Sequence, residues 1–139
     1  MKKKSKVNKK QVFHITAHPY KQDIVVVING DIQDLIKYYE KIGSVSAKKN
    51  AQYVKENIEL DYFDDKTDGT VFPSIPYGYA VLLKHKEGWI TTTEVVAHEC
   101  LHLVHFIMRR VGITLSHESE EAYTYLQGYL LGQILEKMY

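Results

Sequence analysis

The chain has 139 residues and a formal net charge of +1, with 45% apolar and 25% charged residues. These values are typical of one globular domain and argue against a strongly basic nucleic-acid-binding protein. The single cysteine, Cys100, excludes an internal disulfide and a cysteine-based zinc knuckle, and it favours a reducing, intracellular environment.

The net charge is an average over two unlike parts of the chain. Residues 1–10 contain six lysines and no acidic residue, so the remainder carries a formal charge of −5. We expect residues 1–10 to be a disordered basic leader capable of no more than weak nucleic-acid contact, and residues 11–139 to form a single domain. Because no secretory signal and no run of 18 apolar residues is present, we expect a cytoplasmic protein without membrane contact.

Hydrophobic periodicity and turn residues divide the first half of the chain into short elements. They predict, in order, a half-buried strand over 11–18, a buried strand over 23–29, a helix over 32–42, a second helix within 44–60 and an acidic loop over 61–69. Asp31 is expected to cap the first helix, and Gly43 to end it.

A further strand is predicted over residues 77–83. Pro76 and Gly78 fit poorly into a central strand, so we expect this strand at an edge of the sheet. Two helices then complete the chain: one over 92–111, with Thr91 and Glu94 as a capping box, and one over 117–137, with Ser116 as its cap.

The order of these elements, strands first and helices last, favours an α+β fold. We expect a small mixed sheet whose edge strand packs on a buried helix, followed by a second helix at the C-terminus.

Residues 98–102 read His-Glu-Cys-Leu-His, which is the H-E-x-x-H pattern of zinc hydrolases placed on a predicted helix. His98 and His102 are four residues apart, so both imidazoles lie on one helix face and can reach one ion. Glu99 lies about 100° around the helix. From there its carboxylate can act as general base on a zinc-activated water.

The predicted helix around this motif has one narrow polar stripe. On a helical wheel the stripe contains Glu94, His98, His102, His105 and Arg109, and the rest of the surface is apolar apart from Glu99. A helix of this kind is expected to be buried, and histidines on its surface then need a partner such as a metal.

A catalytic zinc ion usually has three protein ligands, so the histidine pair requires one more. Glu118, Glu120 and Glu121 are available at the start of the last helix. Glu121 is favoured because Gly128 and Gly132 share its helix face and would let the H-E-x-x-H helix approach closely. Glu118 is a weaker candidate, and Glu120 is expected to point away.

The segments VVAHECLHLVHFI and GITLSHESEEAYTYLQGYL resemble the gluzincin branch of zinc metallopeptidases, most closely the small single-domain proteins encoded by phages and mobile elements. The resemblance covers about residues 90–132. It implies a zincin-like fold, one zinc ion held by His98, His102 and Glu121, and Glu99 as general base. It also implies hydrolysis of a peptide or protein substrate, and a phage or prophage origin.

In such proteins an edge strand pairs with extended substrate. This role would fall to Tyr77, Gly78, Tyr79 and Ala80. His105, His117 and Tyr125 are candidates for supporting the zinc ligands or for stabilising an oxyanion. The alternative is a non-proteolytic, metal-stabilised binding or assembly module, for which a closed four-ligand site is expected.

Overall fold

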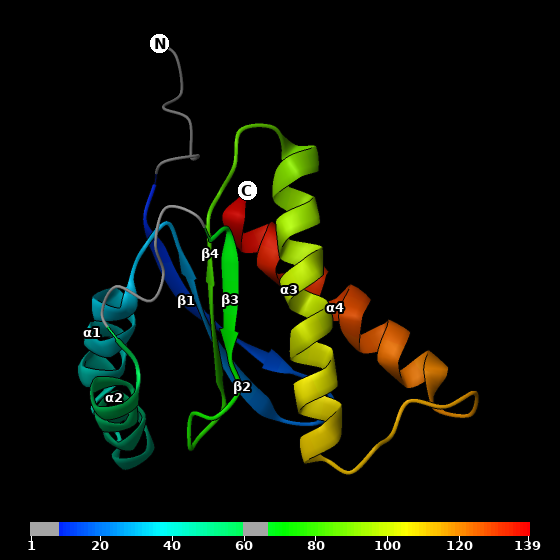
Figure 1. Ribbon diagram of the computed structural model, residues 1–139, viewed down its shortest axis with the longest axis horizontal. Helices are drawn as coiled ribbons and strands as arrows, with labels where there is room; N and C mark the ends of the chain where they lie inside the picture. Colours follow the sequence, from blue (N-terminus) through cyan, green and yellow to red (C-terminus); the bar gives the residue numbers. More distant parts are fainter. Residues whose placement is uncertain (1–8, 60–66) are drawn as a thin grey trace.

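The computed structural model describes residues 9–59 and 67–139, which form an α+β fold of four strands and four helices (Figure 1). In chain order these are β1 Gln11–Ala17, β2 Gln22–Ile28, α1 Ile32–Ile42, α2 Val45–Asn57, β3 Gly69–Phe72, β4 Tyr79–Leu83, α3 Trp89–Arg110 and α4 Glu120–Met138. Most of the predicted leader and of the predicted acidic loop lies outside the described residues. Within the described residues, no helix combines the length and apolarity needed to cross a membrane.

The strands form one mixed sheet in the order β1-β2-β4-β3. The β1–β2 and β3–β4 pairs are antiparallel, and β2 and β4 are parallel. Parallel neighbours need a crossover connection, and α1 and α2 lie within it on one face of the sheet. α3 and α4 cover the opposite face, so the molecule has three layers (Figure 1).

Strand β2 supplies side chains to two separate cores. Ile24, Val26 and Ile28 join the core under α3 and α4, whereas Val25 and Val27 join the core under α1 and α2. Successive side chains of a strand point to opposite faces, so one continuous apolar run serves both layers. The buried strand predicted over 23–29 is therefore confirmed.

The prediction that residues 77–83 form an edge strand is wrong. Strand β4 lies between β2 and β3, and Ala80 pairs with a residue on each of them. Pro76 and Gly78 precede the strand and do not interrupt its pairing. The edge strand that packs beside α3 is β3.

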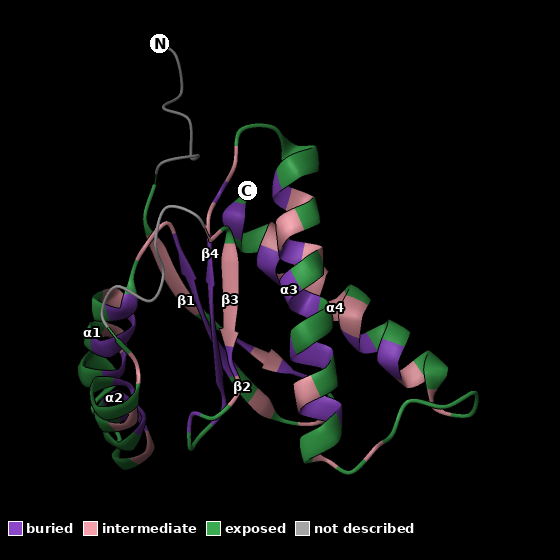
Figure 2. Ribbon diagram, viewed as in Figure 1, coloured by how far each residue is buried: buried purple, intermediate pink, exposed green. Residues whose placement is uncertain are grey.

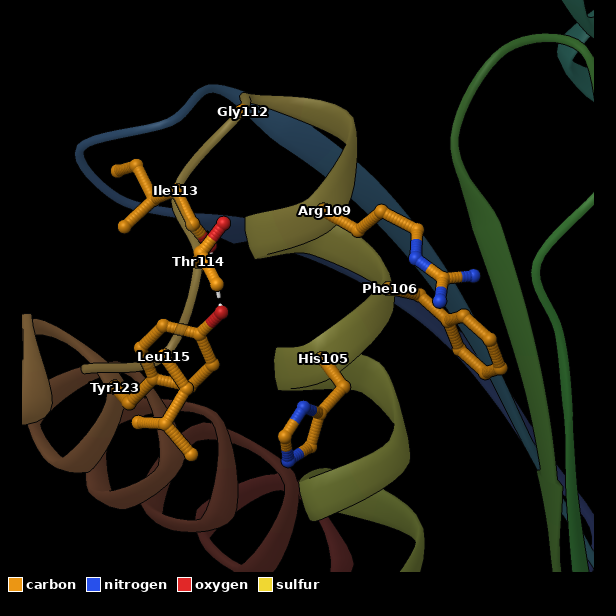
Figure 3. Close-up of a pocket in the computed structure, with 8 residues that line it drawn as sticks. All are labelled: His105, Phe106, Arg109, Gly112, Ile113, Thr114, Leu115 and Tyr123. Carbon is orange, nitrogen blue, oxygen red and sulfur yellow. Dashed lines mark hydrogen bonds between the residues drawn. The ribbon is translucent and has the colours of Figure 1, made fainter.

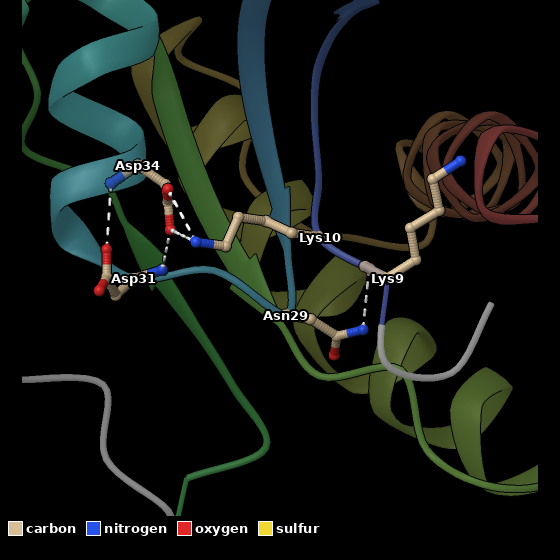
Figure 4. Close-up of polar contacts among 5 residues, drawn as sticks. All are labelled: Lys9, Lys10, Asn29, Asp31 and Asp34. Carbon is tan, nitrogen blue, oxygen red and sulfur yellow. Dashed lines mark hydrogen bonds and ion pairs between the residues drawn. The ribbon is translucent and has the colours of Figure 1, made fainter. Parts of the chain in front are cut away.

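The N-terminus of α1 is capped as predicted (Figure 4). The Asp34 backbone N–H donates to Asp31 at 3.1 Å, and the Asp31 backbone N–H donates to Asp34 at 2.9 Å. Lys10 pairs with Asp34 at 3.2 Å, and the Asn29 side-chain amide donates to the Lys9 carbonyl oxygen. The described end of the leader is therefore joined to the domain.

Helix α3 begins earlier than predicted, and the capping box of Thr91 and Glu94 is not formed. The helix starts at Trp89 without a side-chain cap. Thr92 faces inward instead, and its hydroxyl donates to the Lys86 carbonyl oxygen at 2.8 Å. The hydrogen bond of Thr92 to the preceding turn therefore fixes the start of α3, where the sequence predicts a capping box.

Helix α3 is buried along one face rather than all round, and buried and exposed residues alternate along it (Figure 2). Its buried residues are Thr92, Val96, Glu99, Cys100, Leu103, Val104, Ile107 and Met108. His98, His102 and His105 are exposed on the other face. The polar stripe predicted for this helix therefore faces solvent.

Helix α4 begins at Glu120, after a turn in which the Ser116 backbone N–H donates to the Ser119 hydroxyl at 2.8 Å. Its buried residues are Tyr123, Leu126, Leu130, Ile134 and Met138. A Cβ atom built at Gly128 or at Gly132 would have no heavy atom within 4 Å. The prediction that these two glycines let α3 approach closely is therefore wrong, because their face of α4 is open.

Candidate metal centre

His98 and His102 lie one turn apart on the solvent-facing side of α3, and their rings converge. Their Nε2 atoms are 3.3 Å apart, and the ring centroids are 5.0 Å apart in an edge-on arrangement. Two nitrogen ligands about 2.1 Å from a tetrahedral zinc ion stand about 3.4 Å apart, so this pair fits two positions of such a site. In the metal-free chain the same spacing lets one ring donate a hydrogen bond to the other.

The Glu99 side chain lies beside the histidines and is turned toward β3. It is 7% exposed, and its Oε1 atom is 3.9 Å from Nε2 of His98. Burial raises the pKa of the Glu99 carboxyl, and the nearby His102 and His98 rings offset this only in part. A largely shielded carboxylate next to two potential ligands is suitably placed to act on a water molecule there.

Gly69, the first residue of β3, forms the wall against Glu99. A Cβ atom at Gly69 would lie 2.6 Å from Cγ and 3.0 Å from Cδ of Glu99. Sequence reasoning missed this residue because it placed Gly69 in the acidic loop. The contact depends on how β3 pairs in the sheet, and a glycine at a strand end is a weak signal of close approach.

A cavity of about 440 Å³ opens beside the pair on the N-terminal side of the motif. It is lined by residues 67–69, Glu94, Val95, His98 and Glu99. Asp68 forms an ion pair with Lys86 at 2.9 Å. Lys86 therefore offsets the charge of Asp68, and the other carboxylates of the cavity are Glu94 and the candidate general base Glu99.

The third ligand is not assembled in the part of the chain that the structure describes, where no three His, Cys, Asp or Glu side chains are grouped around one potential ion. Glu121 is exposed in the first turn of α4, on the side away from that helix's buried face, and Glu118 and Glu120 are exposed as well. Because Gly128 and Gly132 do not pack on α3, Glu121 stays a prediction that rests on the family resemblance.

The three candidates for a supporting role have different surroundings. His105 continues the histidine stripe, and its ring packs edge-on against Tyr123 with centroids 5.5 Å apart. The His117 side chain is 96% exposed, and Tyr125 stacks on a neighbouring tyrosine of α4. Of the three, only His105 lies on the same helix face as the histidine pair.

The residues expected to bind substrate through their backbone are not at a free sheet edge. Tyr79 and Ala80 belong to the central strand β4. Tyr77 and Gly78 lie in the turn before it, where Asn50 accepts from the Tyr77 backbone N–H and donates to its carbonyl oxygen. Among the described strands, β3 is the edge strand that adjoins the motif.

Comparison with known proteins identifies no relative of this chain. No family model matches it, and neither a search of curated proteins nor a search of solved structures finds a match. The functional interpretation therefore rests on the motif and on the geometry of these residues.

Proposed function

We propose that this chain is a zinc-dependent peptidase whose active site lies on α3 at His98, Glu99 and His102. The observation that supports the proposal most strongly is the 3.3 Å approach of the two Nε2 atoms beside a buried carboxylate. Histidines that serve only the core would be buried, whereas these two are exposed, and His98 borders a cavity. An exposed pair leaves room for a substrate as well as an ion.

In this proposal His98 and His102 bind the ion, and Glu121 is the candidate third ligand on the resemblance alone. Zinc bound there supplies a Lewis acid that polarises the scissile carbonyl and makes water more acidic. Glu99 accepts a proton from the attacking water and later delivers it to the leaving amine. The wall formed by Gly69 keeps the carboxylate beside the histidines.

The proposed substrate is an extended peptide that pairs with β3. This strand is at one edge of the sheet, and its first residue, Gly69, contacts the Glu99 side chain of α3. A peptide added to this edge by β-augmentation would pass the general base. The cavity of about 440 Å³ beside it can accept a side chain.

The test compares the parent protein with Glu99→Gln and with Glu136→Gln, which changes an exposed glutamate near the end of α4. An amide cannot accept the proton, so we expect Glu99→Gln to lower peptide cleavage by at least about 100-fold. Glu136→Gln should cleave at the parental rate, and both variants should retain one zinc ion. The readouts are cleavage of a fluorogenic peptide library and zinc content by mass spectrometry.

Two further variants link the activity to the histidine pair. His98→Ala and His102→Ala should each lose both zinc and cleavage. Parental cleavage by Glu99→Gln would contradict the proposed mechanism. A parent protein that zinc stabilises but that cleaves no library peptide would instead support the metal-stabilised binding or assembly module.

A further inference from the structure

A second cavity, of about 510 Å³, lies at the C-terminal end of α3, where the chain turns toward α4 (Figure 3). Its walls come from the last turns of α3, from residues 112–115 and from Tyr123 of α4. The Tyr123 hydroxyl donates to the Ile113 carbonyl oxygen at 2.6 Å. This hydrogen bond joins the segment over 112–115 to α4. The cavity therefore lies between α3 and a connecting segment that is fixed to α4.

Arg109 brings a positive charge to one side of this cavity, where its guanidinium lies next to Phe106 (Figure 3). Among the described residues that line it, only Arg109, His105 and Tyr123 are ionisable, and none is a carboxylate. The neighbouring Arg110 is engaged elsewhere, with its guanidinium 4.4 Å from the centroid of the Tyr79 ring. Within the described part of the chain, Arg109 forms no ion pair, so its guanidinium is available to an anionic ligand.

Apolar side chains line much of this cavity, and the Phe106 ring lies beside the Arg109 guanidinium (Figure 3). Phe106 and Ile113 line the cavity, and Leu115, which is 51% exposed, lies at its margin. An arginine with apolar walls favours a carboxylate attached to an organic body over a small hydrated anion, because the body can bury surface there.

The cavity continues the line of the histidine pair along α3. Arg109 is seven residues beyond His102, which corresponds to about 10 Å along a helix axis. An extended peptide covers that distance in about three residues. The cavity on the other side of the pair is lined by Glu94 and by Asp68, which is paired with Lys86. Glu94 and Arg109 therefore give the two ends of this helix face opposite charge.

We infer that the cavity at Arg109 is a subsite for a substrate carboxylate, located about three residues from the scissile bond. Arg109 would bind the carboxylate through its planar fork of N–H donors. Assigning the carboxylate to a peptide rests on the proposed function. The carboxylate comes either from the C-terminus of the peptide or from an acidic side chain.

Peptide binding tests this inference without requiring cleavage. The probes are acetyl-Ala-Ala-Ala-Phe as the free acid, the same peptide as its amide, and acetyl-Ala-Ala-Glu-Phe-amide. They are titrated into the full chain without zinc, so that no carboxylate can bind an ion at the histidines. Nuclear magnetic resonance of ¹⁵N-labelled protein reports the affinity and shows whether the amides of residues 112–115 shift.

At least one acid-bearing probe should bind at least about tenfold more tightly than the uncharged amide. Arg109→Gln should reduce its affinity to that of the amide. Lys48→Gln, which removes the same charge from an exposed residue of α2, should leave it unchanged. Binding of only the free acid would identify a C-terminal carboxylate, and binding of only the glutamate peptide an acidic side chain.

Equal affinity for all three probes, or parental affinity in Arg109→Gln, would overturn the inference. These outcomes are separate from those of the cleavage test. A parent that cleaves peptides but binds all probes equally retains the proposed function and loses the subsite. A parent that selects the acids through Arg109 but cleaves nothing retains the subsite as a carboxylate-binding site and loses the peptidase.

Discussion

The position of the Glu99 side chain depends on Gly69, the first residue of β3. Gly69 leaves the space that the Glu99 methylene and carboxylate occupy, with 2.6 Å between the position of an added Cβ and Glu99 Cγ. Contacts below 3 Å between carbon atoms are repulsive, so any larger residue at position 69 must displace the glutamate. The catalytic geometry proposed for α3 therefore depends on the sheet edge.

We predict that Gly69→Ala lowers peptide cleavage by at least about tenfold while the protein stays folded, because the flexible glutamate moves more easily than the backbone. Gly128→Ala is the matched control, since Gly128 lies on an open face of α4. It should keep parental activity and gain up to about 1 kcal/mol of stability. Cleavage assays and thermal unfolding of both variants are the measurements, and full activity in Gly69→Ala would refute the role of this contact.

At the scale of elements, the N-terminus of α1 shows how a helix cap is linked to pH. Burial raises the pKa of the Asp34 carboxyl, but the hydrogen bond from the Asp31 backbone N–H and the interaction with Lys10 together bring it below its ordinary value of 3.8. A carboxyl whose pKa is lower in the folded state stabilises that state when ionised. Its contribution is complete above the unfolded pKa and is lost as the pH falls through the folded pKa.

We therefore predict that Asp34→Ala lowers the free energy of unfolding by about 1 kcal/mol at pH 7. The difference from the parent should shrink as the pH falls below about 4, where Asp34 becomes protonated. Urea unfolding followed by circular dichroism at several pH values measures both effects. Asp31→Asn, which keeps an oxygen that can cap the helix, should be close to the parent, and a pH-independent loss in Asp34→Ala would contradict the linkage.

At the scale of the whole molecule, one sheet lies between two hydrophobic cores, and only one of them includes residues of α3. The core on the α1 and α2 side contains no residue of the histidine motif, whereas the core on the other side holds the buried face of α3. Leu35 and Leu103 are both fully buried, one in each core. Stability should therefore depend on both cores, and the proposed metal centre mainly on the core that includes α3.

We predict that Leu35→Ala and Leu103→Ala each lower the free energy of unfolding by about 2–5 kcal/mol. Folded Leu35→Ala should bind zinc like the parent, because the sheet separates Leu35 from α3. Leu103→Ala should also weaken zinc binding, since Leu103 is adjacent to His102 and its loss loosens α3. Urea unfolding and zinc competition with a chelator provide the comparison, and weaker zinc binding in Leu35→Ala than in Leu103→Ala would contradict this division.

Several features follow from neighbours in the sequence alone. The α1 cap at Asp31, the end of that helix at Gly43, the buried strand over 23–29 and the α+β class were all predicted and are observed. The spacing of His98 and His102 belongs to the same group, because residues four apart share a helix face whatever packs around the helix. The cap, the helix end and the histidine spacing depend on interactions within one or two helical turns, and the strand and the fold class are signalled by the local pattern of apolar residues.

Other features were decided by tertiary structure. The sheet order places β4 in the centre and β3 at the edge, which the prolines and glycine near residue 77 could not reveal. Packing turns Gly128 and Gly132 toward open space and brings Gly69 against Glu99. These outcomes depend on pairing between segments far apart in the chain. Local composition determined which side chains could perform the chemistry, and long-range packing determined which of them meet.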